Sequence, residues 1–456
     1  MALKHLRISI GGVRGIVGEA LTPDIAVGFA QAFGTYLGPG RVLLSRDTRR
    51  SGPMVVNCVM AGLLGTGCEV VDLGICPTAA LQLAVRYSDA VGGIAVTAGH
   101  NDLRWNALKF IRSDGIFLNP GEAEQLLDTY HEGDFTRATW SQLRPLATDE
   151  DAAEQHLQAI LGQVDVEAIQ AAGFTVAVDC VNGACSRYSP RLLEVLGCTP
   201  VAINTELDMP PPRPPEPSPR YLSQLSTLVR ASGADIGFAH DADGDRLGIV
   251  CEDGSIPGEE VTLCLVEELV LSRGDEGPVV TNLSTTRAVE EIAQRHGKRR
   301  VIRTHIGQAY IAEAALNYSA AVAGEGSGGI VLPKLNYGHD SQAAMVHILQ
   351  LLADRAVPAS RLVAETVPSF HMVKMVVPCQ LDDAFRVLQR VREIPPPDWA
   401  ITQNLEDGIK HIGHDRWVHI RASQTEPVIR VLAETRDPEE ADDLAREWVA
   451  AVRRSM

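Results

Sequence analysis

The strongest chemical signal in this 456-residue chain is a run of three alternating acidic residues. Asp241, Asp243 and Asp245 stand in the segment DADGDR (241–246), just after the apolar run DIGFA. The small residues between them let the backbone fold so that three carboxylates converge, and such a concentration of negative charge needs a cation. Oxygen ligands of this kind favour Mg²⁺, so the segment predicts a magnesium site.

Two other interpretations of this segment are a solvated acidic turn and the start of an EF-hand. An EF-hand requires a glutamate at the twelfth loop position, and Glu252 stands there. However, the seventh to eleventh positions read LGIVC, which is typical of a strand rather than of a loop. We therefore favour the magnesium site.

A second segment, VTAGHN (96–101), has the surroundings of an active-site loop but no side chain at its centre. Thr97, His100, Asn101 and the later Lys109 lie around Gly99. The segment follows an apolar run, so we expect it at the carboxyl end of a strand, where α/β proteins bind ligands.

Two further segments have residue types that suit a phosphorylated sugar. RASQTEPVIR (421–430) combines hydroxyls and guanidinium groups that can hold a phosphate; the alternative is an ordinary polar turn. GEGSGG (324–329) places Glu325 and Ser327 between glycines, where they can bond sugar hydroxyls; the alternative is a flexible loop. GGVRG (11–15) places Arg14 between glycines but is not a dinucleotide fingerprint.

The elements around these segments predict an α/β protein of several domains. Apolar strand-like runs alternate with helical stretches, which is typical of α/β units with largely parallel sheets. After residue 367 the pattern changes to strands near 371–377, 416–421 and 427–434, followed by an amphipathic helix from Pro438 to Arg454. The Pro-rich segment 209–220 is interpreted as a rigid surface connection. We place four domains at 1–150, 151–254, 255–366 and 367–456.

Composition excludes several classes of protein. A formal net charge of −17 disfavours nucleic-acid binding. No apolar run is long enough for a membrane span, and the start is not a secretory signal, so we expect a cytoplasmic protein without a membrane partner. The nine dispersed cysteines indicate buried reduced thiols rather than disulfides or a zinc site.

Taken in order, these segments resemble the α-D-phosphohexomutase superfamily, which includes phosphoglucomutase, phosphomannomutase and phosphoglucosamine mutase. The similarity covers nearly the whole chain, including GGVRG, SRDTRRSG, VTAGHN, PRPPEPSP, DADGDR, GEGSGG and RASQTEP. It implies three mixed-sheet α/β domains and a C-terminal α+β domain around a central cleft. It also implies interconversion of a hexose or hexosamine 6-phosphate and 1-phosphate through a bisphosphorylated sugar, and a possible homodimer.

The resemblance also implies a role for each candidate residue. Asp241, Asp243 and Asp245 would bind Mg²⁺, and Arg246 would lie beside the phosphoryl group. Arg14 and Lys109 would lie near the transferred proton and phosphoryl group, with His100 shaping the loop. Glu325 and Ser327 would contact sugar hydroxyls, and the phosphate that does not react would be held by Arg421, Ser423, Gln424, Thr425 and Arg430.

The chain departs from the family pattern at the nucleophile. The family motif reads Thr-Ala-Ser-His-Asn-Pro, whereas this chain has Gly99 at the phosphoserine position and Asp102 at the proline position. The histidine that many relatives carry in the sugar loop is Gly328 or Gly329 here. A covalent phosphoenzyme needs a side-chain nucleophile, and glycine has none.

Three functions remain open after this departure. The protein could be a mutase by a modified route, with an acyl phosphate on Asp102, a phosphoramidate on His100, or direct donation by a bisphosphorylated sugar. For Asp102, capping of the turn is the simpler interpretation. The protein could instead be a sugar-phosphate-binding homologue without turnover, or a weak phosphatase in which water replaces the serine. A laboratory substitution at Gly99 would give the same sequence.

Overall fold

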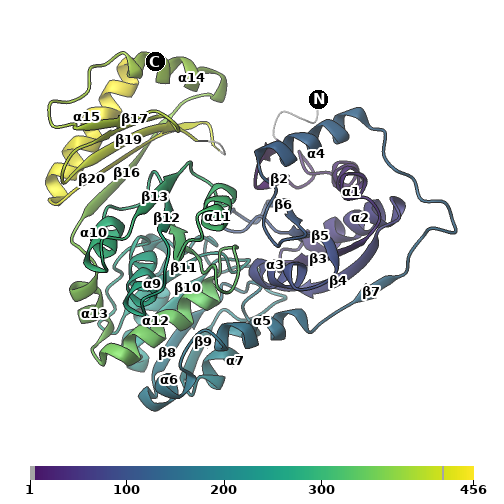
Figure 1. The fold of residues 1–456 in the computed structure, drawn as a ribbon, viewed down its shortest axis with the longest axis horizontal. Coiled ribbons are helices and arrows are strands. Elements are labelled where there is room, and N and C mark those ends of the chain that lie inside the picture. The colour runs from purple at the N-terminus through teal and green to yellow at the C-terminus, as the bar shows by residue number, and fades with distance from the viewer. Residues whose placement is uncertain (1–5, 424–425) are drawn as a thin grey trace.

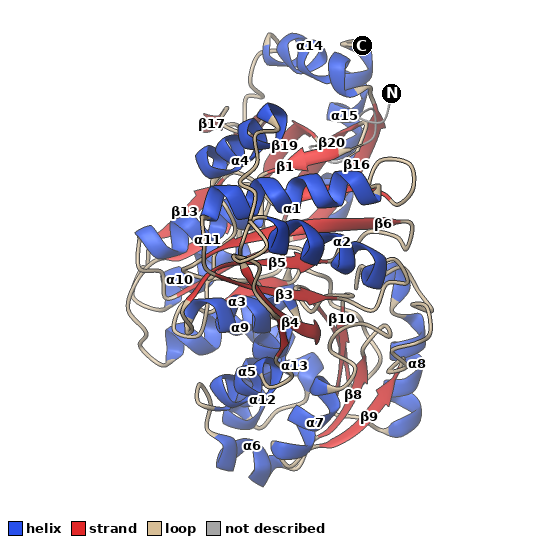
Figure 2. Ribbon diagram, turned by 90° about the vertical axis from the view of Figure 1, so that its right-hand side faces the viewer, coloured by secondary structure: helices blue, strands red, loops and turns tan. Residues whose placement is uncertain are grey.

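The computed structural model describes residues 6–423 and 426–456, and within them four β-sheets follow one another along the chain. The first three sheets mix parallel and antiparallel strands and alternate with helices, and the fourth is antiparallel. The prediction of three α/β domains and a C-terminal α+β domain is confirmed. The fourth sheet and the second lie at opposite ends of the molecule (Figures 1 and 2).

The first domain contains a seven-stranded sheet in the order β1-β2-β6-β5-β3-β4-β7. Its central strands are parallel, and β6 and β2 run antiparallel to their neighbours on one side of the sheet. The sheet strands are β1 Arg7–Ser9, β2 Gly12–Ile16, β3 Arg41–Arg46, β4 Glu69–Ile75, β5 Ala90–Val96, β6 Trp105–Arg112 and β7 Leu146–Thr148. The helices are α1 Pro23–Leu37, α2 Gly52–Gly65, α3 Thr78–Arg86 and α4 Pro120–Glu132.

The second domain contains a four-stranded sheet in the order β11-β10-β8-β9. The acidic segment 241–246 joins the antiparallel pair β10 and β11, so it is the turn of a β-hairpin. The flanking strands exclude an EF-hand, which needs a helix on each side of its loop. The bounds are β8 Thr175–Asp179, β9 Thr199–Ile203, β10 Ile236–His240, β11 Leu247–Cys251, α5 Ala152–Leu161, α6 Val166–Ala172, α7 Tyr188–Val195, the short 3₁₀ helix η2 Pro219–Tyr221 and α8 Ser223–Ser232.

The third domain repeats the same plan, with strand order β13-β12-β14-β15. Helices α9 and α12 are buried along almost their whole length, because they pack between the second and third sheets. The bounds are α9 Val261–Ser272, β12 Val279–Asn282, α10 Ala288–Arg295, β13 Val301–Thr304, α11 Gln308–Asn317, β14 Val322–Glu325, β15 Gly329–Val331, α12 Ser341–Arg355 and α13 Ala359–Thr366.

The fourth domain is a five-stranded antiparallel sheet covered by two helices, in the order β16-β20-β19-β18-β17. The alternating strands and the final amphipathic helix lie within a residue or two of their predicted positions. The bounds are β16 His371–Pro378, α14 Leu381–Arg392, β17 Thr402–Asn404, β18 Ile409–Ile412, β19 Trp417–Ala422, β20 Val428–Thr435 and α15 Pro438–Arg454.

The Pro-rich segment 209–220 lies at the surface, with residues 209, 210, 212, 214, 219 and 220 exposed, and two of its charged residues also pair with the rest of the protein. Arg213 in this segment donates to the buried carboxylate of Asp179 at 2.6 Å, and Glu216 pairs with Arg246 at 3.0 Å. The segment is therefore a surface connection that these two pairs anchor to the protein. All nine cysteines are free, and eight of them are buried. Within residues 6–423 and 426–456, none of the helices combines the length and the apolar character needed to cross a bilayer.

Candidate active site

Loops from the first three domains meet at the acidic hairpin turn 241–246. The backbone N–H of Thr78 donates to the carbonyl of Asp243 at 3.0 Å, and that of Ser341 donates to the carbonyl of Gly244 at 2.9 Å. The hydroxyl of Thr97 in the first domain lies 3.2 Å from Oδ2 of Asp243. The turn is thus fixed between the first and third domains, although these contacts span large distances in sequence.

The turn after β5 places Gly99 next to the carboxylate of Asp243. Gly99 has a φ of +53°, and its N–H donates to the hydroxyl of Thr97 at 3.0 Å. A Cβ built on Gly99 would lie 3.2 Å from Oδ1 of Asp243 and 3.3 Å from Oδ2. A side chain at this position would therefore project onto the acidic turn.

A buried arginine that sequence reasoning did not single out fixes this turn. Arg49 is 3% exposed, and its Nε pairs with Oδ2 of Asp47 at 2.8 Å. The rest of its guanidinium group donates to four backbone carbonyls of the turn: Gly99, Asn101, Asp102 and Trp105. The quoted segment SRDTRRSG contained the signal, since a charged run directly after a buried strand lies at the ligand-binding edge of the sheet.

The three aspartates of the hairpin turn are buried and incompletely paired. Oδ1 of Asp241 accepts from the N–H groups of Asp245 and Arg246, at 2.8 and 3.0 Å. One oxygen of each carboxylate, Asp241 Oδ2, Asp243 Oδ1 and Asp245 Oδ1, is buried without a hydrogen-bond partner. Burial and the neighbouring carboxylates raise the pKa of Asp241 well above its usual range and that of Asp245 to about 7. The surroundings therefore supply too little positive charge to favour ionisation of all three carboxyl groups.

Among the residues that the structure describes, Lys109 on β6 is the cation that contacts two of these carboxylates directly. Its Nζ lies 2.7 Å from Oδ2 of Asp243 and 2.7 Å from Oδ2 of Asp245. Burial alone would lower the pKa of Lys109, but the two carboxylates raise it above its usual value. Burial would likewise raise the pKa of Asp243, and Lys109 holds it below the usual range.

The carboxylate oxygens of the three aspartates suit a hard divalent cation, although the side chains do not have the geometry of a complete metal site. Among the described residues, no group of three His, Cys, Asp or Glu side chains has the geometry of a metal site. Lys109 lies between two of the aspartates and takes one oxygen from each. The three unpartnered oxygens of the cluster are the ligands that Mg²⁺ prefers.

The sugar-loop candidates Glu325 and Ser327 lie beside this cluster. Glu325 is 9% exposed, and it accepts from the hydroxyl of Ser327 at 2.6 Å and from Nδ2 of Asn282 at 3.1 Å. Burial would raise the pKa of Glu325, but His339 and Arg246 lower it, so the carboxylate is ionised. Arg246, at the end of the acidic turn, forms a backbone bridge to Gly329 and so joins the two loops.

His339 is a second residue that sequence reasoning missed. It is 2% exposed, and its Nε2 has no hydrogen-bond partner. A Cβ on Gly329 would lie only 2.4 Å from Nδ1 of His339, so the imidazole fills the space beside this glycine. The chain thus has a histidine against the loop 324–329, and this histidine comes ten residues after Gly329. The sequence signal for His339 was Gly329, because a glycine at a buried strand leaves space that the side chain of another residue can fill.

The phosphate-loop candidates belong to the fourth domain. Arg421 on β19 is directly opposite Arg430 on β20, and the buried Nε of Arg421 has no partner. Burial and Arg430 lower the pKa of Arg421, while Asp407 and Glu325 act in the opposite direction. The hydroxyl of Ser423 accepts from the N–H of Glu426 at 3.1 Å. Gln424 and Thr425 lie outside the described residues.

The structure brings the candidates of the first three domains together more closely than those of the fourth. Arg14 donates to Oδ1 of Asn101 at 3.3 Å, and burial, followed by Arg7 and Arg246, lowers the pKa of its guanidinium group. Arg430 instead pairs with Glu426 on its own turn. Asp102 accepts from the backbone and guanidinium groups of Arg104, so it forms the turn cap that was the simpler of its two interpretations.

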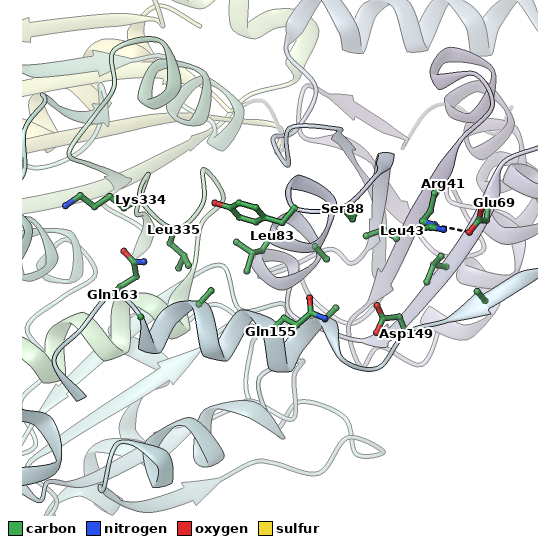
Figure 3. A pocket seen from close by; sticks show the side chains of 17 residues that line it. Arg41, Leu43, Glu69, Leu83, Ser88, Asp149, Gln155, Gln163, Lys334 and Leu335 are labelled. Carbon is green, nitrogen blue, oxygen red and sulfur yellow. Dashed lines mark hydrogen bonds and ion pairs between the residues drawn. The ribbon is translucent and has the colours of Figure 1, made fainter. Parts of the chain in front are cut away.

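A pocket of about 700 Å³ lies at the other end of the first sheet (Figure 3). It is lined by Arg41 and Glu69, the first residues of β3 and β4, together with Tyr87, Gln155 and Lys334. The candidate site instead lies beyond the last residues of the strands. The pocket is therefore separate from the chemistry described above.

The fold matches solved phosphohexomutases. A phosphoglucomutase/phosphomannomutase family protein from Burkholderia thailandensis superposes with a TM-score of 0.84 at 24% identity, covering 98% of each chain. The N-acetylphosphoglucosamine mutase of Aspergillus fumigatus, solved with GlcNAc-6P and magnesium, gives a TM-score of 0.56 at 16% identity over 90% of this chain and 82% of that one. At these identities the likeness shows a shared fold.

The sequence comparisons are more specific. The four phosphoglucomutase/phosphomannomutase domain models match residues 8–137, 154–254, 257–370 and 379–451, in order. The chain therefore belongs to the phosphoglucomutase/phosphomannomutase family, within the α-D-phosphohexomutases. A phosphoglucomutase/phosphomannomutase of Thermococcus kodakarensis is 36% identical over 436 residues, covering 94% of each chain. A phosphoglucosamine/phosphogalactosamine mutase of Sulfurisphaera tokodaii is 31% identical over 445 residues, covering 96% of each.

Proposed function

We propose that this protein is a phosphohexomutase-type isomerase that moves a phosphoryl group between the 6- and 1-oxygens of a hexose or hexosamine phosphate, through a bisphosphorylated sugar. A hexosamine phosphate is the substrate we favour, because relatives over nearly the whole chain are named phosphoglucosamine mutases. The observation that carries the proposal is the position of Gly99, whose Cβ direction faces Asp243 beside the sugar loop.

In this proposal each group of side chains has a separate task. Glu325 accepts hydrogen bonds from sugar hydroxyls, and the hydroxyl of Ser327 exchanges hydrogen bonds with them. The bonds of Glu325 to Ser327 and Asn282 fix the orientation of its carboxylate. Arg421, with Ser423, Gln424, Thr425 and Arg430, holds the phosphate that does not react, because a guanidinium group binds a phosphate through two parallel hydrogen bonds. The reacting phosphate then lies near Arg246, Arg14 and Lys109.

Lys109 donates a proton during the phosphoryl transfer. Its Nζ contacts the acidic turn, from which it can also donate to the sugar oxygen that leaves phosphorus. Asp241, Asp243 and Asp245 would hold Mg²⁺ through their unpartnered oxygens. When bound, this ion offsets negative charge on the transferred phosphoryl group.

An assay with sugar phosphates tests this proposal. The protein is mixed with Mg²⁺ and glucosamine 6-phosphate or glucose 1-phosphate, with and without a hexose 1,6-bisphosphate, and the products are followed by ³¹P NMR. Isomerised sugar phosphate supports the proposal. Binding without any product indicates a binding homologue, release of inorganic phosphate alone indicates a phosphatase, and either result overturns the proposal.

A matched pair of variants separates the site from the fold. Asp243→Asn removes a carboxylate of the acidic turn, and Asp208→Asn changes an exposed residue of the same domain. We expect the first variant to lose the isomerisation and the second to keep it. Equal activity of the two variants would contradict a catalytic centre at the acidic turn.

A further inference from the structure

The loop 282–286, which follows β12, holds the sugar loop 324–329 from one side. Nδ2 of Asn282 donates to Oε2 of Glu325 at 3.1 Å. The hydroxyl of Thr285 accepts from a backbone N–H of the sugar loop at 3.2 Å. Because these bonds join the two loops, a displacement of the loop 282–286 would also move the carboxylate of Glu325.

The fourth domain contacts the loop 282–286 through two side chains on one face of its sheet. Lys410 on β18 is directly opposite His419 on β19. Nζ of Lys410 donates to the carbonyl of Leu283, and Nδ1 of His419 lies 2.9 Å from the hydroxyl oxygen of Ser284. Arg421 is two residues further along β19, so it belongs to the same face of the sheet as His419. The strand that carries Arg421 is thus fixed against this loop.

The surroundings of His419 define which of its nitrogens carries the proton. The ring is fully buried, and its Nε2 lies 2.6 Å from the carbonyl oxygen of Asp407. A carbonyl can only accept, so Nε2 is the N–H donor. Burial, followed by Lys410, lowers the pKa of His419 to about 3, so the ring is neutral. Nδ1 therefore accepts a hydrogen bond from the hydroxyl of Ser284.

The contact of His419 with Asp407 holds a turn against the candidate phosphate-binding arginine. The next residue, Gly408, has a φ of +92°, and a Cβ built on it would lie 2.8 Å from Cβ of Arg421. A side chain at this position would collide with Arg421, so the close approach requires glycine. One ring nitrogen of His419 thus holds the turn beside Arg421, and the other holds the loop that orients Glu325.

We propose that His419 is a positioning residue that sets the separation between the phosphate held at Arg421 and the sugar hydroxyls held at Glu325. This inference rests on the proposed function, since one sugar phosphate must contact both residues. A ligand gains fully from two contacts only where the protein already holds both groups at the span of the ligand, because binding then requires no rearrangement. The hydrogen bond from Ser284 to Nδ1 of His419 fixes this span.

Two substitutions of His419 separate its two hydrogen bonds. His419→Gln places an amide N–H near the position of Nε2 and loses the bond to Ser284. His419→Asn places an amide oxygen near the position of Nδ1 and keeps that bond. The full chain is titrated with glucosamine 6-phosphate and with glucose 1-phosphate in the presence of Mg²⁺, by isothermal titration calorimetry. For the sugar phosphate that the wild type binds more tightly, we expect His419→Gln to bind about tenfold more weakly and His419→Asn to stay within about twofold of the wild type.

A variant of the partner residue completes a double-mutant cycle. Ser284→Ala deletes the hydroxyl but keeps the backbone N–H that donates to Asn282. It should weaken binding as much as His419→Gln does, and the double variant should bind no more weakly than either single variant. The control His371→Gln changes an exposed histidine of the same domain and should bind like the wild type. Thermal unfolding of each variant checks that it is folded at the temperature of the titration.

The outcomes distinguish this inference from the proposed function. Equal losses in His419→Gln and His419→Asn, additive losses in the double variant, or wild-type affinity in Ser284→Ala would each overturn the positioning role and leave the proposed function standing. A wild type that binds neither sugar phosphate would overturn both.

Discussion

The Cβ direction of Gly99 points at the carboxylate of Asp243, 3.2 Å from its nearer oxygen. Gly99 belongs to the first domain and Asp243 to the second, so this approach exists only because the chain folds the two turns against each other. The contact is close but not prohibitive, since a shift of a few tenths of an ångström would accommodate a side chain. A side chain could therefore be restored at this position.

We predict that Gly99→Ser raises phosphoryl transfer from hexose 1,6-bisphosphate by orders of magnitude. The hydroxyl would stand next to Asp243 and would supply the side-chain nucleophile that Gly99 lacks. The φ of +53° makes any side chain here cost about 1–2 kcal/mol of stability. Steady-state mutase kinetics and thermal unfolding measure the two effects.

Gly99→Ala is the matched control, because it has the same backbone strain and the same Cβ but no hydroxyl. It should lose as much thermal stability as Gly99→Ser and gain no activity. If both variants gained activity equally, the hydroxyl would not be the cause.

We predict that Lys109→Gln makes the protein depend on Mg²⁺ for its stability. Removing the ammonium leaves Asp243 and Asp245 buried without the cation that contacts both, at a cost of about 3–5 kcal/mol. A divalent ion at the same oxygens replaces the lost charge, so added Mg²⁺ should raise the unfolding temperature more in the variant than in the wild type. Lys334→Gln, which breaks an exposed pair with Asp275, should show the wild-type response.

Gly329→Ala should disturb the sugar loop through His339. The new Cβ would meet the imidazole at 2.4 Å, and we expect about 1–3 kcal/mol of destabilisation with weaker sugar-phosphate binding. Adding His339→Ala removes the clash. The double variant should therefore lose less unfolding free energy than the two single variants lose together. Gly65→Ala, where a Cβ has nothing within 4 Å, serves as the control. Simple additivity of the two changes would argue against the contact.

The sequence predicts what depends on local order and misses what depends on distant contacts. The strands on either side of 241–246 and the helix Pro438–Arg454 follow from apolar runs and helical periodicity, which neighbouring residues set. Arg49, however, acts on carbonyls about 50 residues away, and His339 takes the space beside a strand that precedes it by ten residues. The Pro-rich segment shows the same limit, because its composition predicts a surface connection but not the ion pairs that Arg213 and Glu216 form with Asp179 and Arg246.

Residue types at the site were easier to predict than their pairing. The three aspartates and Lys109 were assigned from sequence patterns and family resemblance, but the bridge from one ammonium to two carboxylates is visible only in three dimensions. The same holds for His100, whose pKa is lowered by burial and then by Arg246 and Arg14, which belong to two other segments.

A buried carboxyl far from the proposed chemistry should make stability fall as pH rises. Glu267 on α9 is fully buried, and neither of its oxygens has a hydrogen-bond partner. Burial, followed by Glu290 and Glu268, raises its pKa well above 4.5 in the folded protein. Above pH 4.5 the unfolded chain loses this proton while the folded chain keeps it, so stability falls by up to about 1.4 kcal/mol per pH unit until the folded pKa is reached. The glutamine of Glu267→Gln cannot ionise, so the unfolding temperature of this variant should exceed that of the wild type by an amount that grows between pH 5 and pH 8. The control Glu447→Gln changes an exposed residue and should follow the wild type. A constant difference between Glu267→Gln and the wild type across this range would show that Glu267 is ionised in the folded protein.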